Sequence, residues 1–327
     1  MRWLLPFAGL LLLPGCATRL APPGPAIGAP AMTAEAFRMA DGAVLPYRAW
    51  LPDAPPRAVV LALHGMNDSR DAWEYPGPAF ARAGVAVYAP DQRGFGATDS
   101  RGLWPTAQGL ASDAAAMAAL LRARNPSVPL IAMGESMGGA VLAVAATGAE
   151  PPAVDAYVLL APAVWGRARM NPLMRAALWI AARAVPGWTP RPPAGVVRRA
   201  SDNDEALRRL SANPLTVKAT RMDAAEGLVD LMDAALAAAP RIPARALILY
   251  GAKDEFVPPQ ATRAMWAALP EGPTLAFYPD GWHLLPRDLG RDAPIGDILA
   301  WIERPYAPLP SGADKAAAAW LADQASR

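Results

Sequence analysis

The run Gly134-Glu135-Ser136-Met137-Gly138-Gly139 holds a serine with a glycine two positions to either side. An apolar stretch, residues 130–133, precedes the run, and small apolar residues follow it at 140–146. This order predicts a strand that turns sharply into a helix around Ser136, where side chains on the flanking glycines would collide. G-x-S-x-G in this context is typical of a nucleophilic serine, which also needs a base, an acid and donors for an oxyanion.

The chain contains two histidines, so few residues can serve as the base. His283 follows the last strand-like run, whereas His64 directly follows an early one, upstream of the serine. Only His283 fits the chain order serine, acid, histidine. We therefore expect His283 to be the base and His64 to support the loop that carries an oxyanion donor. A buried or surface histidine without a catalytic role is the alternative for His283.

Asp254 is the expected acid. It follows a strand-like run at residues 246–250 and Gly251, and a proline shortly after it can open a helix. A carboxylate at this place would hold His283 in the productive tautomer and stabilise the imidazolium that forms. Glu255 is the competing candidate, because spacing alone does not exclude a shift by one residue. Both acids could instead be charges at a helix N-terminus, but the Gly-x-x-Asp spacing favours Asp254.

Backbone N–H groups must meet the negative charge that develops on a carbonyl oxygen under attack. One donor is expected at Met137, directly after the serine and at the start of the following helix. The other is expected at Met66 in the loop His64-Gly65-Met66, where Gly65 lets the backbone approach closely. The side chains of both methionines are expected to line the pocket.

Strand-like and helix-like segments alternate along most of the chain. This alternation predicts the α/β class, with a mostly parallel central sheet and helices on both faces. Continuous apolar runs, typical of strands buried on both faces, lie at residues 58–63, 85–89, 130–133, 156–160, 246–250 and 274–278.

The alternation is interrupted at residues 163–240, which carry helical patterns and several arginines. We interpret this stretch as a helical cap, inserted after the strand that follows the nucleophile helix. The core then comprises residues 37–162 and 241–306, and an alanine-rich helix lies in a C-terminal extension, residues 307–327. The cap also carries Trp165, Trp179 and Trp188.

The N-terminus has the pattern of an export signal, with a positive start and a short apolar segment over residues 1–15. Leu13-Pro14-Gly15-Cys16 resembles the lipobox of bacterial lipoproteins, which implies cleavage before Cys16 and a diacylglycerol on its thiol. Residues 16–36, rich in proline, alanine and glycine, would then be a flexible tether. The resemblance implies an exported, membrane-anchored protein that faces the periplasm or the cell exterior. An ordinary secretory peptide with an incidental cysteine is the alternative.

Composition narrows the function classes. Hydrophobic residues make up 53% of the 327 residues, which argues against disorder of the whole chain. The net charge of +2 gives no reason to expect nucleic acid as a partner. The sequence shows no metal-binding cluster, phosphate-binding glycine loop or flavin fingerprint, so it implies no cofactor. It does not indicate an oligomeric state.

Taken together, the motifs resemble the α/β-hydrolase superfamily, in its monoacylglycerol lipase and lysophospholipase-like branch. The resemblance covers about residues 37–305 and implies a cap that admits acyl chains to the pocket. The loop at 91–96 is expected to be structural, with Arg93 paired locally. The matching motifs are His64-Gly65-Met66, Asp91-x-Arg93-Gly94-x-Gly96, Gly134-Glu135-Ser136-Met137-Gly138-Gly139, Gly251-x-x-Asp254 and His283.

These residues favour a serine hydrolase that cleaves carboxylic esters through an acyl-enzyme. The branch suggests a lipid-like ester, such as a monoacylglycerol or a lysophospholipid. A small-ester esterase, a thioesterase or a peptidase with the same triad is the alternative among enzymes. From another class, a non-catalytic binding lipoprotein could use the same fold, because fold alone does not fix function.

Overall fold

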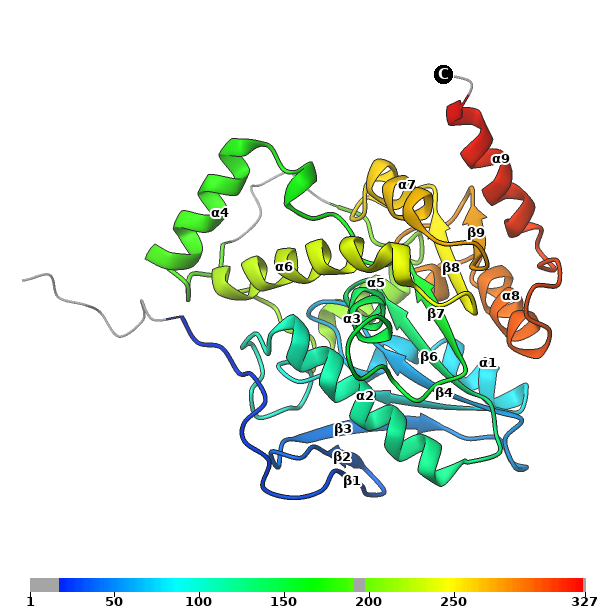
Figure 1. Ribbon diagram of the computed structural model, residues 1–327, viewed down its shortest axis with the longest axis horizontal. Helices are drawn as coiled ribbons and strands as arrows, with labels where there is room; N and C mark the ends of the chain where they lie inside the picture. Colours follow the sequence, from blue (N-terminus) through cyan, green and yellow to red (C-terminus); the bar gives the residue numbers. More distant parts are fainter. Residues whose placement is uncertain (1–17, 191–197, 326–327) are drawn as a thin grey trace, which may run out of the picture.

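The computed structural model describes residues 18–190 and 198–325. In this part of the chain the strands form one sheet in the order β1-β2-β3-β5-β4-β6-β7-β8-β9 (Figure 1). β1 (Ala31–Met32), β2 (Ala36–Arg38) and β3 (Val44–Trp50) form an antiparallel edge. The other strands run parallel, as predicted: β4 (Ala58–Leu63), β5 (Val85–Pro90), β6 (Leu130–Glu135), β7 (Ala156–Leu160), β8 (Ala246–Gly251) and β9 (Thr274–Tyr278).

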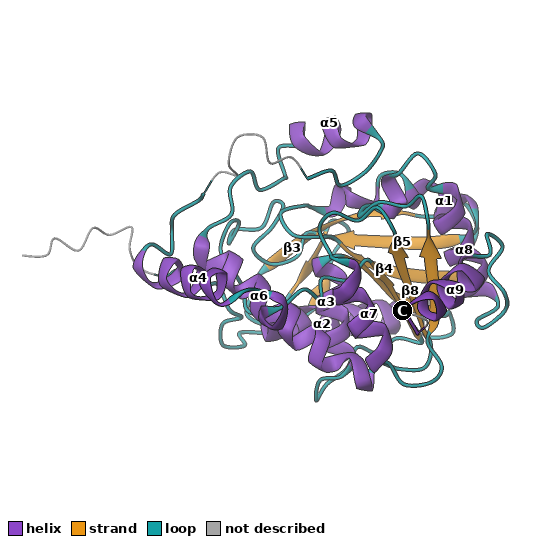
Figure 2. Cartoon of the chain, turned by 90° about the horizontal axis from the view of Figure 1, so that it is seen from above, coloured by secondary structure: helices purple, strands orange, loops and turns teal. Residues whose placement is uncertain are grey.

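Helices cover both faces of the sheet, which explains why the parallel strands are apolar along their whole length (Figure 2). On β4, Val59, Leu61 and Leu63 point into one core, whereas Val60 and Ala62 point into the other. The second core is closed by α1 (Pro76–Arg82) and α8 (Asp292–Glu303). The first core is closed by α2 (Ala107–Arg124), α3 (Met137–Ala146), α6 (Met222–Ala238), α7 (Pro259–Ala268) and α9 (Ala313–Ala325).

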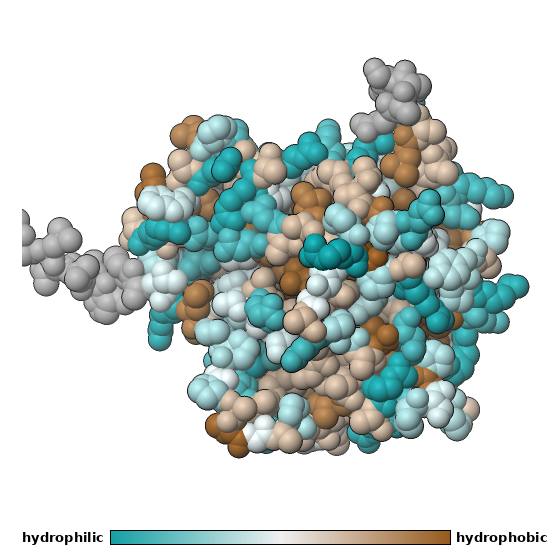
Figure 3. All heavy atoms as spheres, viewed as in Figure 1, coloured by the Kyte–Doolittle hydropathy of each residue, from teal (hydrophilic) through white to brown (hydrophobic). Residues whose placement is uncertain are grey.

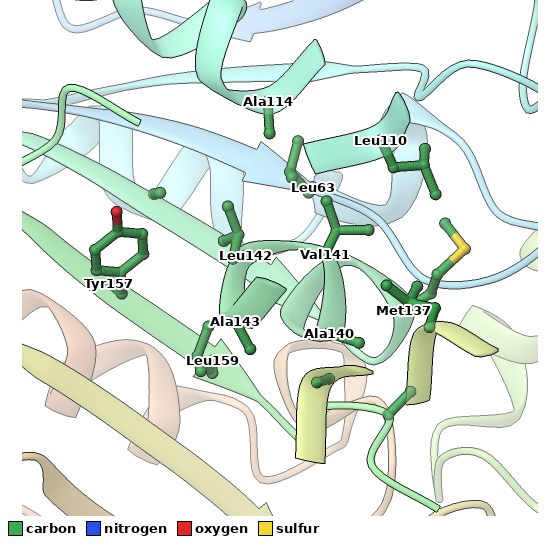
Figure 4. Packing of buried hydrophobic residues seen from close by; sticks show 14 of the residues in the cluster. Leu63, Leu110, Ala114, Met137, Ala140, Val141, Leu142, Ala143, Tyr157 and Leu159 are labelled. Atoms are coloured by element: carbon green, nitrogen blue, oxygen red, sulfur yellow. The ribbon is translucent and has the colours of Figure 1, made fainter. Parts of the chain in front are cut away.

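The helix that carries the elbow, α3, is itself a core element. Val141 and Leu142 are fully buried, and they pack with Leu110 of α2 and Leu63 of β4 (Figure 4). The small residues that follow the serine therefore allow α3 to lie close to the sheet and to α2. This packing fixes the end of the helix from which Ser136 projects.

The predicted cap region lies between β7 and β8, and it is not uniform. α4 (Pro172–Ala184) and α5 (Asp204–Ala212) start at asparagine caps and bury one residue each. α6 instead reaches into the main core, where Leu231 is fully buried. A Cβ on Gly227 of α6 would lie 2.3 Å from the indole of Trp104. The inner helix of the region predicted as a cap is thus part of the core.

The predicted tether, residues 16–36, is not free over its described part. Ala21 N–H donates to the carbonyl of Trp104 at 2.9 Å, and Ile27 N–H donates to that of Ala40 at 2.8 Å. Further along, β1 and β2 extend the sheet. These backbone hydrogen bonds hold the segment to the core, so the folded part begins before residue 37. Residues 1–17, with the predicted signal and Cys16, lie outside the described residues.

The C-terminal extension is also part of the fold, because α9 covers β9. Trp320 of α9 stacks on Phe277 of β9, with ring centroids 4.7 Å apart and planes 14° apart. The guanidinium of Arg263 in α7 lies 3.6 Å from the centre of the same indole. Among the described helices, none is both long and apolar enough to cross a membrane.

We expect Trp320→Ala to lower the free energy of unfolding by about 3 kcal/mol, the lower end for a tryptophan truncation, because the indole is only partly buried. Urea denaturation measures the change. Lys315→Ala, at an exposed position of the same helix, is the control and should stay within about 0.5 kcal/mol of the wild type. Equal effects of the two substitutions would show that the packing of α9 on β9 does not stabilise the fold.

Candidate active site

Ser136 lies at the turn between β6 and α3, in the strained backbone conformation that the motif predicts. Its φ of 53° and ψ of −113° are unusual for a residue with a side chain. A Cβ on Gly134 would lie 2.4 Å from the carbonyl carbon of Gly138, and one on Gly138 would lie 2.3 Å from the carbonyl oxygen of Leu63. Real Cβ atoms do not approach so closely, so both positions require glycine.

His283 is joined to Asp254 in a buried pair. The Nδ1 of His283 lies 2.8 Å from the Oδ2 of Asp254, and both side chains are at most 6% exposed. The other carboxylate oxygen accepts the backbone N–H groups of Phe256 and Val257, at 2.7 and 2.9 Å. Glu255, the competing candidate, is exposed and accepts the N–H of Arg199 at 2.6 Å. The structure thus brings Asp254 to His283 and directs Glu255 elsewhere.

The surroundings of the two histidines shift their pKa values in opposite directions. Burial lowers the pKa of His283, but the Asp254 carboxylate, with smaller contributions from Glu135 and Asp288, raises it above the ordinary value of 6.5 overall. Burial also lowers the pKa of His64, and the nearby acids do not compensate, so its net pKa is below 6.5. His283 is therefore the histidine whose charged form the protein stabilises.

His64 fixes the loop that follows β4. Its Nε2 accepts the N–H of Gln92 at 3.0 Å, which leaves the proton on Nδ1 to donate to the carbonyl of Gly65 at 2.8 Å. The carbonyl of Gly65 and the N–H of Met66 belong to the same planar trans peptide, so they point in opposite directions. By holding the carbonyl, His64 sets the direction of the Met66 N–H.

Both predicted oxyanion donors are free of protein acceptors among the described residues. In the part of the chain that the structure describes, no hydrogen bond is donated by the backbone N–H of Met66 or of Met137. The side chains of the two methionines differ, however. Met66 lines the pocket as expected. Met137, the first residue of α3, is instead fully buried in the core (Figure 4), so the prediction that its side chain lines the pocket was wrong.

Ser136 and His283 open into one cavity of about 400 Å³ between the core and the cap. Its polar lining includes Asn67, Arg198 and Thr216. The rest is mostly apolar, and the cap region supplies much of it. The apolar side chains come from Met66, Ala163, Trp165, Ala200, Leu210, Leu228, Met232, Phe256, Val257 and Leu284.

Two groups of paired charged residues were not predicted from the sequence. Arg93 does not pair locally: it bridges Asp41 and Asp113, both at 2.7 Å and both distant in the sequence. Near the pocket, Arg287 contacts Asp68 and lies 3.9 Å from Glu135. One signal was available for this second group, because a glutamate next to Ser136 at the end of a buried strand requires a partner.

A mostly parallel sheet, a strained serine between β6 and α3, and a histidine after the last strand define an α/β-hydrolase of the serine type. The Hydrolase_4 family model, described as serine aminopeptidase S33, matches residues 54–290. The chain belongs to this family and is a lipase- and esterase-like serine hydrolase.

Its relatives include proteins named as lipases. The monoacylglycerol lipase of Mycolicibacterium smegmatis is 27% identical over 274 residues, covering 82% of this chain and 96% of the relative. The monoglyceride lipase of Rattus norvegicus is 23% identical over 271 residues, with coverages of 80% and 88%. The crystal structure of Paleococcus ferrophilus monoacylglycerol lipase superposes with a TM-score of 0.66 at 21% identity, covering 79% of this chain and 98% of that one. The chain is thus similar to monoacylglycerol lipases over most of its length.

Because the chain has two histidines, NMR can follow each of them separately. We expect the imidazole signal of His283 to titrate above pH 6.5 and that of His64 below it. Asp254→Asn removes the carboxylate that stabilises the imidazolium, so the midpoint of His283 should fall. A His283→Gln variant assigns the signals. Titration of both histidines near 6.5, or an unchanged midpoint in Asp254→Asn, would contradict the assignment of the pair.

Proposed function

We propose that this protein hydrolyses carboxylic esters with a lipid-like acyl chain, such as monoacylglycerols or lysophospholipids. The observation that carries the proposal is the apolar cavity onto which Ser136 and His283 open. Its volume, about 400 Å³, falls within the range of small-molecule sites, and its walls are mostly hydrocarbon. The names of the relatives agree with this substrate class.

In the proposed reaction the Oγ of Ser136 attacks the ester carbonyl while His283 takes its proton. Asp254 accepts the Nδ1–H of His283 and stabilises the imidazolium. The N–H groups of Met66 and Met137 receive the negative charge on the carbonyl oxygen. The imidazolium then protonates the leaving alcohol, which leaves an acyl-enzyme. Water, deprotonated by His283, then attacks the acyl-enzyme, and the imidazolium returns its proton to the Oγ of Ser136 as the carboxylic acid leaves.

The competing functions make different demands on the same cavity. A small-ester esterase would not need the apolar walls that the cap supplies, and an aminopeptidase would need to bind an amide together with a charged amino terminus. A non-catalytic binding lipoprotein would not need the strained serine or the buried His283–Asp254 pair. The cavity and the buried pair together favour the lipid-like ester.

A panel of p-nitrophenyl esters from acetyl to palmitoyl, together with a monoacylglycerol, a lysophospholipid and an aminoacyl p-nitroanilide, tests the proposal. We expect kcat/KM to rise with acyl chain length and a fluorophosphonate probe to label Ser136. Ser136→Ala should abolish turnover, with a loss on the order of 10⁶-fold as for other catalytic serines. Activity confined to acetyl esters would exclude lipid-like esters as the substrate class. A folded protein that the fluorophosphonate does not label would favour a binding role.

We also propose that the enzyme works at the surface of a lipid bilayer. Acylation of Cys16, predicted from the lipobox-like motif, would anchor the chain to a bilayer that faces the periplasm or the cell exterior. An independent feature of the described residues fits a lipid surface. On α4, Leu173, Trp179 and Ile180 are 79%, 56% and 55% exposed. Figure 3 shows apolar side chains at the upper left, where α4 lies in Figure 1.

The charge around α4 is positive on balance, although Arg167 and Arg183 pair with acidic residues of α6. Between residues 156 and 201 the sequence has seven arginines and no acidic residue. Arg183 stacks over the ring of Trp179 at 4.4 Å, and Arg169 and Arg175 are exposed. Apolar aromatic residues flanked by arginines are typical of a helix that rests in the headgroup region. We infer that α4 contacts the lipid surface from which the substrate enters the cavity.

Flotation with vesicles of phosphatidylcholine and phosphatidylglycerol tests this contact in the full chain bearing Cys16→Ser, which removes the acylation site. Trp179→Asp with Ile180→Asp should weaken vesicle binding at least tenfold, because burial of each side chain contributes about 1.5–3 kcal/mol. Leu51→Asp, at an exposed leucine after β3, is the matched control. Hydrolysis of a soluble short ester should stay unchanged. Equal binding by both variants would contradict the role of α4.

A further inference from the structure

Arg287 connects three segments of the site. It ends the short helix η4 (Leu285–Arg287), which begins two residues after His283, and it is 3% exposed. Its Nε donates to the carbonyl of Ala72 at 3.1 Å, and its Nη2 donates to the carboxylate of Asp68. The same Nη2 lies 3.9 Å from the carboxylate of Glu135, the neighbour of the serine.

The three segments are those that the reaction must hold together. Asp68 belongs to the loop after β4, which presents Met66 as an oxyanion donor, and Ala72 belongs to the short helix η1 (Arg70–Trp73) that follows this loop. Glu135 ends β6, directly before Ser136. Arg287 itself lies in the loop that presents His283. One guanidinium therefore spans the loop of the oxyanion donor, the elbow and the loop of the base.

The backbone of Arg287 is fixed as well. Its carbonyl accepts the side-chain amide of Asn203 at 2.9 Å. The next residue, Asp288, accepts the N–H of Trp282 at 2.8 Å and the hydroxyl of Ser201 at 2.6 Å. The side chain of Arg287 thus connects its own anchored backbone to the loop after β4. A side chain of another length or shape would shift this loop relative to the loop that carries His283.

Glu135 explains why position 287 holds a positively charged residue. Its carboxylate is buried, and one oxygen has no hydrogen-bond partner among the described residues. Burial raises the pKa of Glu135 to about 7, although Arg287 opposes the shift. Without Arg287, the buried side chains of Asp68 and Glu135 would lose the cation that both face, and the loop after β4 would lose its tie to the elbow.

We propose that Arg287 is a positioning residue for ester hydrolysis, which holds the Met66 N–H at the required place relative to Ser136 and His283. The inference rests on the proposed function, since it takes Ser136 as the nucleophile. A guanidinium has a rigid, planar set of donors and can meet Ala72 and Asp68 at once, whereas a lysine ammonium is a flexible point charge. Arg287→Lys therefore keeps the charge and loses the positioning.

The test measures kcat and KM for a p-nitrophenyl ester that the wild type hydrolyses. We expect Arg287→Lys to lower kcat about 10- to 100-fold with KM within about twofold, because a small misplacement of an oxyanion donor acts in the transition state. Binding of an alkyl boronic acid, which forms a tetrahedral adduct with the serine, should weaken by the same factor as kcat/KM. A purely structural role would not link these two losses in folded protein.

Arg122→Lys is the matched control. Arg122 also bridges an aspartate and a backbone carbonyl, those of Asp155 and Val128, but at the amino end of β6, away from the elbow. It should leave kcat unchanged. Asp68→Asn, which keeps the size of the side chain and an acceptor oxygen, is the second variant at the site. Asp68→Asn should also lower kcat, and it tests the inference if Arg287→Lys does not fold.

Labelling of the wild type by a fluorophosphonate separates this inference from the proposed function. A wild type that is folded and not labelled overturns both. A wild type that is labelled, with wild-type kcat in folded Arg287→Lys or Asp68→Asn, overturns the positioning role and leaves the function standing. A loss of kcat no larger than in Arg122→Lys overturns it as well.

Discussion

The lack of space at the turn around Ser136 is the constraint on which the site depends. β6 must end and α3 must begin within one residue, so Gly134 approaches Gly138, and Gly138 approaches the end of β4. A serine with a φ of 53° is unfavourable by about 1–3 kcal/mol in isolation, and the packed core around α3 holds it there. A Cβ on Gly65 would lie 3.4 Å from the Cβ of Ser136, so the loop after β4 passes close to the serine. Nucleophile and oxyanion loop are therefore adjacent because the strands that carry them are paired.

The cap region is tied to two of the loops that form the site. Its residue Ala200 accepts the N–H of Leu284, next to His283, at 2.9 Å. On the other side, Val217 donates to the carbonyl of Asn67 at 2.8 Å, next to Met66. A movement of these cap segments would therefore act directly on the loops of the base and of the oxyanion donor. Substrate entry under the cap and the geometry of the chemistry are coupled through these backbone hydrogen bonds.

Local signals in the sequence predicted the sheet, the turn and the residues that the structure places at its carboxyl edge. His64 and Ser136 directly follow apolar strands, and Asp254 and His283 lie in the loops after theirs, so the strand pattern also indicates their positions. Long-range pairing left no such signal. Asp68 and Arg287 are 219 residues apart, and Arg93 pairs with Asp41 across 52. The packing of residues 18–36 was missed because its backbone hydrogen bonds do not depend on an apolar pattern.

Buried charges beside the cavity are costly in a site meant for hydrocarbon, and their arrangement explains why they are there. A buried ion pair contributes little net stability, because desolvation offsets the attraction of its charges. Asp68, Arg287 and Glu135 are therefore poorly explained as a device for stability alone. Hydrophobic contacts tolerate sliding, whereas a guanidinium that bridges two loops fixes direction as well as distance. Since the reaction requires backbone donors to stay in place while an apolar acyl chain enters and leaves, charged contacts supply the rigidity that the apolar walls lack.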